Sequence, residues 1–273
     1  MLIFLSLSII LIGCSSIRLE EYTKNIFALN TYITLTAYGG KDTPKILDKA
    51  EKRVMEIEEL MSTEIDTSDV ALINKNAGIA PVEVSEDTFY VIERALWYSK
   101  MSDGAFDITI YPISKLWDIT GENPRVPNKG EIEELLPLVN YREVILDKDK
   151  KTVFLSKTGM GIDLGAIAKG YAADEVGRIL GECGIEHALI NLGGDIVARD
   201  PRGHETGAEY IAVVKIADNS IVSSGDYERY LEEEYENTGK RYHHIFDPKT
   251  GYPADSGLIA TTVIAEQSID ADA

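Results

Sequence analysis

Apolar residues recur at helical spacing in the first half of the chain and alternate with polar residues in several shorter stretches. Residues 32–38 alternate in this way and predict a strand. A helix is expected to open after Asp42, with Pro44 at an early helical position. Spacings of three and four predict the buried face of this helix, formed by Ile46, Leu47, Ala50, Val54, Ile57 and Met61. A second helix is expected from Ser85 to about Met101, with Val91, Ile92, Ala95, Leu96 and Tyr98 facing inward.

The later part of the chain predicts strands around one more helix. Residues 141–155 are expected to form a hairpin with a charged turn at 147–151. Residues 163–165 are expected to end a strand and turn into a helix that stops near Gly181 or Gly184. Further strands are expected at residues 188–192, 210–217, 220–223, 242–246 and 258–265. This order predicts an α+β fold with antiparallel sheets and flanking helices.

The first fourteen residues are almost entirely apolar and uncharged. The run is shorter than the roughly 20 residues that span a bilayer, and it has the length of the apolar region of a signal peptide. Its end, Leu11-Ile12-Gly13-Cys14, resembles a bacterial lipobox and implies cleavage before Cys14 and lipidation of its sulfur. No Lys or Arg precedes the run, and a buried N-terminal strand or a plain signal peptide are the alternatives. We expect a lipoprotein signal peptide at residues 1–13, a tether at 14–24 and one domain at 25–273.

Charge and cysteine content narrow the function classes. The 273 residues include 27 Lys and Arg against 46 Asp and Glu, a formal net charge of −19. Nucleic-acid binding depends on cationic side chains that neutralise phosphates, so this class is excluded. Cys14 and Cys183 cannot build a disulfide framework. With Cys14 lipidated, Cys183 would be the remaining thiol, and we expect it to be buried at a helix end.

Glycine-rich segments at three places in the chain are candidate ligand loops. The spacing at residues 159–165 departs from the dinucleotide fingerprint, and residues 165–172 lack the Lys and Ser or Thr of a P-loop. A strand-to-helix turn at 163–170 nevertheless has free backbone N–H groups that can hold a phosphate, and Lys169 adds a positive charge. The turns at 191–195 and 223–227 permit a close approach to a ligand, with plain glycine turns as the alternative.

Histidines and late carboxylates supply the other candidate chemistry. His243 and His244 are adjacent, so on a strand they would face opposite ways and could not both ligate one metal. One of them is a candidate acid, base or phosphate contact, and the alternative is a surface histidine beside a core histidine. Asp270 and Asp272 follow an apolar strand and are hard oxygen ligands suited to Mg²⁺ or Ca²⁺; an acidic tail is the alternative.

Six short segments, taken in order, resemble the motifs of one family. They are residues 104–107 (GAFD), 163–172 (DLGAIAKGYA), 191–195 (NLGGD), 224–227 (SGDY), 244–248 (HIFDP) and 270–272 (DAD). Each is weak alone, but six in the family's order are a strong match. From about Phe27 to the last residue, the chain is similar to the FAD:protein FMN transferases, the ApbE family. This resemblance implies an ApbE-like α+β fold that binds FAD and a magnesium ion.

The resemblance also implies the site residues. The backbone carbonyl of Ala166 and the carboxylate of Asp272 correspond to metal ligands. The family's third ligand lies four residues after Asp272, and the chain stops at Ala273, so the C-terminal end of the domain is expected to be missing. The FAD site is implied to include Leu29, Thr63, Ala105, Phe106, Asp107, Asp163, Lys169 and His243. His244 is placed near the reacting pyrophosphate, and either Asp272 or His244 would position or deprotonate the attacking hydroxyl.

By the same resemblance, the expected reaction is Mg²⁺-dependent transfer of FMN from FAD to a Thr or Ser of an acceptor redox protein, with release of AMP. Two alternatives stay open: an FAD pyrophosphatase that gives FMN and AMP, and a lipoprotein that binds FAD without turnover. The expected location is the bacterial cell membrane, with the chain lipid-anchored and facing the periplasm or the cell exterior.

Overall fold

The computed structural model describes residues 19–193, 195–198 and 218–273. Its larger sheet is antiparallel, with strand order β1-β2-β6-β7-β8-β9. These strands are β1 (Glu20–Ala28), β2 (Thr31–Gly39), β6 (His187–Leu192), β7 (Asp195–Ala198), β8 (Asn219–Gly225) and β9 (Ala260–Ala265). A two-residue turn joins β1 to β2, and Leu29 and Asn30 both have positive φ there, 52° and 55°. Such turns match the natural twist of a hairpin.

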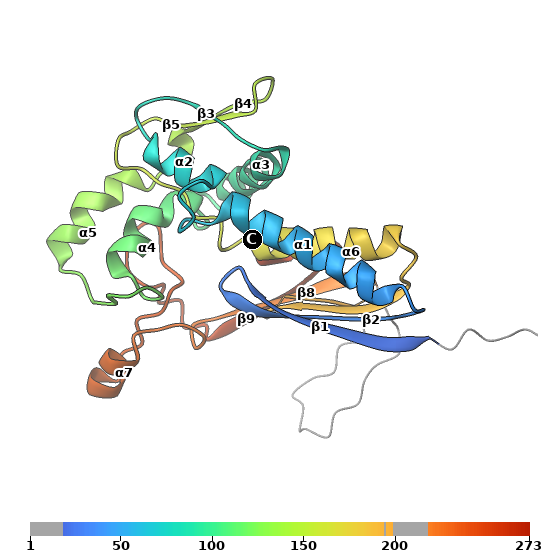
Figure 1. Ribbon diagram of the computed structural model, residues 1–273. Coiled ribbons are helices and arrows are strands. Elements are labelled where there is room, and N and C mark those ends of the chain that lie inside the picture. The colour runs from blue at the N-terminus through green and yellow to red at the C-terminus, as the bar shows by residue number, and fades with distance from the viewer. Residues whose placement is uncertain (1–18, 194, 199–217) are drawn as a thin grey trace, which may run out of the picture.

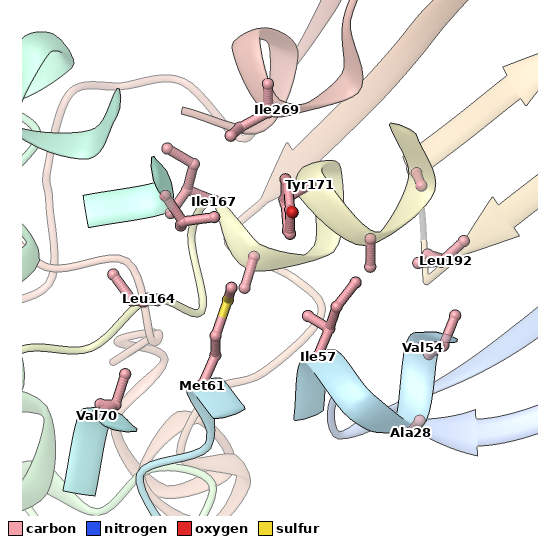
Figure 2. Packing of buried hydrophobic residues seen from close by; sticks show 14 of the residues in the cluster. Ala28, Val54, Ile57, Met61, Val70, Leu164, Ile167, Tyr171, Leu192 and Ile269 are labelled. Carbon is pink, nitrogen blue, oxygen red and sulfur yellow. The ribbon is translucent and has the colours of Figure 1, made fainter. Parts of the chain in front are cut away.

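Two helices cover one face of this sheet, α1 (Thr43–Met61) and α6 (Ala168–Glu182) (Figure 1). Alternate residues of the central strands are fully buried beneath them, among them Ile33, Leu35, Ile190 and Leu192. The stripe predicted for the first helix is confirmed at Leu47, Ala50, Val54, Ile57 and Met61, which are all buried. Figure 2 shows Ile57 and Met61 pointing from α1 toward α6. This layer places the N-terminus of α6 at the edge of the main core.

A second lobe is formed by a small sheet and several short helices (Figure 1). Its sheet has the order β3-β5-β4. The elements are α2 (Asp69–Lys75), β3 (Val82–Glu83), α3 (Glu86–Met101), η1 (Ile108–Ile110), α4 (Tyr111–Trp117), α5 (Lys129–Leu135), η2 (Leu136–Leu138), η3 (Tyr141–Glu143), β4 (Val144–Asp147) and β5 (Thr152–Leu155). Helix α3 starts as predicted, with the Ser85 side chain accepting a hydrogen bond from Thr88 N–H. The predicted hairpin is β4–β5.

The last part of the chain returns to the main sheet through a loop that packs on this lobe. It contains α7 (Glu232–Thr238) and ends, after β9, in α8 (Ser268–Asp272). Trp117 of α4 is fully buried and lies 5.4–5.9 Å, ring to ring, from Tyr242, Phe246 and Tyr252 of the loop. Its indole N–H donates to the Gly251 carbonyl at 2.9 Å. This small core fixes the loop that carries His243 and His244.

Several expectations are corrected by the fold. Residues 20–24, expected in a tether, belong to β1 because each of them pairs with β2. Residues 163 and 164 form no strand, and Gly165 begins a turn that leads into α6. Residues 242–246 make only isolated bridges among the described residues, Tyr230 to His243 and Phe246 to Pro253. Cys183 is exposed, because it is the residue at which α6 ends and the chain turns outward.

Some expectations fall outside the described residues. The strand at 210–217, the signal peptide and the lipidation site at Cys14 all lie there. Within the described part of the chain, no helix has the length and apolar character needed to cross a membrane.

Candidate active site at the start of α6

The carboxylate of Asp272 is buried against the first turn of α6. Its side chain is only 3% exposed. Lys169 Nζ lies 3.0 Å from Oδ1 and 3.3 Å from Oδ2, and the Gly170 N–H donates to Oδ2 at 3.0 Å. A charge taken out of water needs such partners. The structure thus brings together Lys169 and Asp272, which the sequence separates by about a hundred residues.

This contact changes the hydrogen bonding at the start of α6. In a regular helix the Gly170 N–H would donate to the carbonyl of Ala166, four residues earlier. Here it donates to Asp272 instead. Among the described residues no hydrogen bond to the Ala166 carbonyl is found, and Ala166 is exposed. A carbonyl oxygen that no described residue bonds and a carboxylate therefore flank the same helical turn.

Gly170 is required by the close approach of α8 to α6. A Cβ built at this position would lie 2.4 Å from the carbonyl oxygen of Ser268 and 2.8 Å from Cβ of Asp272. Both are atoms that cannot rotate away as the end of a flexible side chain can. The glycine in the motif at residues 163–172 thus lets the C-terminal segment lie directly on the helix.

Asp163 stands at the entrance to the same turn. Its backbone N–H donates to the Ile108 carbonyl at 2.8 Å, and its Oδ1 accepts from Gly165 N–H at 2.8 Å. Burial raises the pKa of the Asp163 carboxyl; the nearby carboxylate of Glu64 adds to this, and Lys169 opposes it. The two hydrogen bonds fix Asp163 between η1 and the start of the turn.

The loop at 104–107 is held in place by its last residue. The Asp107 carboxylate is buried and accepts from Thr109 N–H at 2.8 Å, Thr109 Oγ1–H at 2.6 Å and Tyr141 N–H at 2.9 Å. It therefore holds the loop in shape, while Ala105 is exposed and Phe106 is half-buried beside it. Any contribution of residues 105–107 to FAD binding remains a prediction.

Leu29 and Thr63 sit at the ends of the β1–β2 hairpin and of α1. The Leu29 N–H donates to Glu58 Oε1 at 2.8 Å, which holds a leucine at a positive φ that this residue type seldom adopts. Thr63 Oγ1 donates to Glu64 at 3.2 Å. The Asn30 carbonyl accepts from Arg229 at 2.7 Å, so the hairpin reaches the loop that carries the histidines. Their predicted contacts with FAD are not tested by these bonds.

The two adjacent histidines have different surroundings. His243 is buried; its Nδ1 accepts from Ile245 N–H at 3.3 Å and its Nε2–H donates to the Ala254 carbonyl at 3.0 Å. Both of its ring nitrogens are thus used inside the protein. His244 donates from Nδ1 to the Arg229 carbonyl at 3.1 Å, and no partner for its Nε2 is found among the described residues.

Electrostatics keeps His244 neutral. Burial, with smaller effects from the positive charges of Arg229 and Lys169, lowers its pKa to about 4. With Nδ1 protonated, Nε2 carries the lone pair and can accept a proton. Of the two histidines, His244 is the one with a ring nitrogen that no described residue bonds.

Two residues that the sequence did not single out hold α8. The Asp174 carboxylate of α6 accepts from Ser268 N–H at 2.7 Å and from Ile269 N–H at 2.9 Å. Arg94 of α3 donates to Asp270 Oδ1 from Nε and Nη2, at 2.8 and 2.7 Å. No local sequence pattern signals these contacts, because the partners lie far apart along the chain.

Comparison with known proteins gives this site its context. A sequence model described as "ApbE family" matches residues 29–273. The chain belongs to the ApbE family. It is 37% identical to the FAD:protein FMN transferase of Klebsiella pneumoniae, over 92% of this chain and 79% of that protein. It is 33% identical to the FAD:protein FMN transferase of Treponema pallidum, over 94% of this chain and 77% of that protein.

Solved structures of the ApbE family confirm the fold. The ApbE protein of Thermotoga maritima superposes with a TM-score of 0.83 at 34% identity, covering 93% of this chain and 84% of that one. The flavinyl transferase ApbE of Pseudomonas stutzeri gives 0.80 at 25% identity, with 94% and 84% coverage. The predicted α+β, ApbE-like fold with antiparallel sheets and flanking helices is thus confirmed.

Two further features define what the site is made of. The described residues contain no group of three or more His, Cys, Asp and Glu side chains that could hold a metal ion. Two cavities, of about 390 and 330 Å³, are lined by none of the predicted site residues. Neither finding adds a residue to the candidate site at the start of α6.

Proposed function

We propose that this protein is an Mg²⁺-dependent FAD:protein FMN transferase that attaches FMN from FAD to a Thr or Ser of an acceptor redox protein and releases AMP. The observation that carries the proposal is the cluster at the start of α6. Asp272, Lys169 and the unpaired Ala166 carbonyl meet there, in a chain whose ApbE relatives are named for this reaction.

The donor chemistry at this turn suits magnesium. Mg²⁺ prefers oxygen ligands, is commonly held by one or two carboxylates, and keeps positions for water and substrate phosphates. The Ala166 carbonyl and the Asp272 carboxylate are such oxygens, and the exposed Ala166 leaves that side of the turn open. When bound, the ion would neutralise charge on the pyrophosphate, which a chain of net charge −19 would otherwise repel.

The chain's own residues divide the remaining work. Lys169 provides a positive charge for phosphate oxygens, and Asp163 lies at the entrance to the turn. His244 Nε2 takes the proton of the acceptor hydroxyl, whose oxygen forms a bond to the FMN-side phosphorus. The bond from this phosphorus to the AMP phosphate breaks, and AMP leaves with the bonding electrons. Asp272 is engaged by two donors, so we assign it to metal binding rather than to proton transfer.

A histidine with a pKa of about 4 is a weak base, and we expect bound substrate to make His244 a stronger one. The pyrophosphate of FAD is anionic, and an opposite charge close by stabilises the imidazolium. The pKa of His244 should therefore rise from about 4 toward neutrality in the complex. Burial keeps the ring neutral beforehand, ready to accept the proton.

We further propose that the chain is lipidated at Cys14 and faces the periplasm or the cell exterior at the bacterial membrane. The support is the lipobox-like sequence ending at Cys14. Labelling cells with a radioactive or clickable fatty acid should label the wild-type protein and not the Cys14→Ala variant. Equal labelling of the two would contradict lipidation at this residue.

The two adjacent histidines provide a test of the catalytic assignment. His244→Gln should lower AMP formation from FAD and Mg²⁺ by about 10²-fold or more, the usual scale for a general base. His243→Gln should chiefly lower the melting temperature, because it breaks internal bonds. Asp272→Ala should abolish the reaction. Unchanged turnover in both His244→Gln and Asp272→Ala would show that the site lies elsewhere.

A further inference from the structure

The short helix α8 is held at its N-terminus by α6. The two oxygens of Asp174 each accept one backbone hydrogen bond, from Ser268 N–H at 2.7 Å and from Ile269 N–H at 2.9 Å. The first N–H groups of any helix have no partner within it. A carboxylate from another helix therefore replaces the local capping residue that α8 lacks.

The opposite flank of α8 is held by α3. Arg94 directs Nε and Nη2 at the same oxygen of Asp270, at 2.8 and 2.7 Å. Its guanidinium also lies over the rings of Trp97 and Tyr98, at 4.8 and 5.4 Å from their centroids. Stacking of this kind restricts the arginine and prepares it to bind a carboxylate.

These contacts matter because α8 is too short to hold its own shape. Its five residues fall well below the roughly 12 residues at which an isolated helix becomes marginally stable. Its position must come from tertiary contacts, and Asp272 is its last residue. We propose that Asp174 and Arg94 are positioning residues that form a clamp on α8 and thereby hold the Asp272 carboxylate at the start of α6. The functional meaning of this clamp rests on the proposed function; its structural meaning does not.

The proposal predicts the effect of removing one charge. Asp174→Asn turns one of the two carboxylate oxygens into an NH₂ group, so one of the two backbone N–H groups meets a donor instead of an acceptor. The N-terminus of α8 should become more mobile, and the hydrogen bond from Gly170 N–H to the Asp272 carboxylate should be formed for a smaller fraction of the time. The matched control is Glu182→Gln, the same change on the same helix. Glu182 is 56% exposed and bonds only to Arg178 among the contacts described for it.

Amide hydrogen exchange in the protein without FAD or metal tests the clamp directly. The probes are Gly170 N–H and a peptide covering residues 268–273. Asp174→Asn should speed exchange at both by about tenfold or more, since bonds to a charged group are worth more than neutral ones. Glu182→Gln should leave both unchanged. Equal exchange in wild type and Asp174→Asn would overturn the proposal.

A second readout ties the clamp to the metal site. In Asp174→Asn the Mg²⁺ concentration that gives half-maximal FAD cleavage should rise several-fold, while the KM for FAD at saturating Mg²⁺ changes less. Faster exchange with an unchanged Mg²⁺ requirement would also overturn the positioning role. If the wild type cleaves no FAD, the proposed function fails, but the exchange result still decides whether Asp174 holds α8.

Arg94 gives a second variant in case Asp174→Asn does not fold. Arg94→Gln acts from α3, outside α6, and should raise the Mg²⁺ requirement in the same direction. Because Arg94 acts through Asp270, the double variant Arg94→Gln/Asp270→Asn should be no worse than the worse of the two single variants. Additive losses in Mg²⁺ requirement would show that Arg94 does not work through Asp270.

Discussion

Gly170 offers the sharpest test of how the candidate site is built. Substitution by alanine adds one methyl group at the contact between α6 and α8. That carbon would lie 2.4, 2.7 and 2.8 Å from the Ser268 carbonyl oxygen, the Ser268 carbonyl carbon and Asp272 Cβ. An ordinary contact between carbon atoms is about 3.5 Å or longer. The segment at residues 268–272 would have to move away by about 1 Å.

The size of the effect follows from two opposing contributions. Alanine in place of glycine within a helix is favourable by about 1 kcal/mol, whereas an extra carbon in a filled contact costs about 1–3 kcal/mol. Gly177→Ala on the same helix isolates the steric contribution, because among the described residues its Cβ would meet Ile190 Cδ1 alone, at an ordinary contact distance of 3.8 Å. The propensity gain is common to the two variants, so Gly170→Ala should be less stable than Gly177→Ala by about 1–3 kcal/mol.

Thermal unfolding and turnover provide the assay. For a chain of this size, about 1 kcal/mol corresponds to about 2–4 °C in melting temperature. Gly177→Ala should melt at or above the wild-type temperature and keep its activity. Gly170→Ala should melt several degrees below Gly177→Ala and require more Mg²⁺ for turnover, because Asp272 moves with α8. Equal melting temperatures and equal Mg²⁺ requirements in the two variants would refute the reasoning.

Three further predictions concern charge and packing. Because its pKa is lowered to about 4, His244 of the free protein should show no titration between pH 5 and 8 by NMR. Its contribution to the free energy of unfolding should rise as the pH increases from about 4 to 6.5. An NMR titration midpoint near pH 6.5 would contradict the burial of this ring. Burial raises the pKa of Asp174 from 3.8 to about 6, so the folded state binds its proton more tightly. The contribution of this group to the free energy of unfolding should therefore fall by about 2 kcal/mol as pH rises from 4 to 6. The same pH dependence in Asp174→Asn would refute this. Trp117→Phe removes the bond to the Gly251 carbonyl and should cost about 1–3 kcal/mol in chemical denaturation, where a change within about 0.5 kcal/mol would contradict the account.

The sequence predicted those parts of the fold that follow from local periodicity. The stripe on α1 and the alternation in β2 appear in the structure because each faces one core. Strand β1 escaped prediction because its first residues, Glu20 and Glu21, are polar and exposed; its partner β2, not its own apolar content, makes it a strand. The segment at 242–246 has strand-like composition, but its aromatic residues, Tyr242 and Phe246, pack against Trp117 in a separate small core instead of joining a sheet.

The candidate site also contains residues that the sequence predicted and residues that it did not. Motif residues gave Asp272, Ala166 and Lys169, and the structure places them around one helical turn. The resemblance already favoured His244 over His243; the structure adds a physical reason, which is that the described residues give both ring nitrogens of His243, but only one of His244, an internal partner. Asp174 and Arg94 were missed because their partners lie far away in the sequence. Asp174 bonds to Ser268, 94 positions later, and Arg94 bonds to Asp270, 176 positions later. No local pattern encodes a contact of that kind.

The most direct test of the central claim follows the atoms of FAD. The protein is incubated with FAD, MgCl₂ and an acceptor redox protein that carries a Thr-containing flavinylation motif. Intact mass spectrometry follows the acceptor, and chromatography follows AMP. The account predicts that the acceptor gains the mass of FAD minus AMP, with one AMP formed per modified acceptor and neither product with Asp272→Ala. AMP with an unmodified acceptor, or FAD that stays intact in the presence of Mg²⁺, would contradict it.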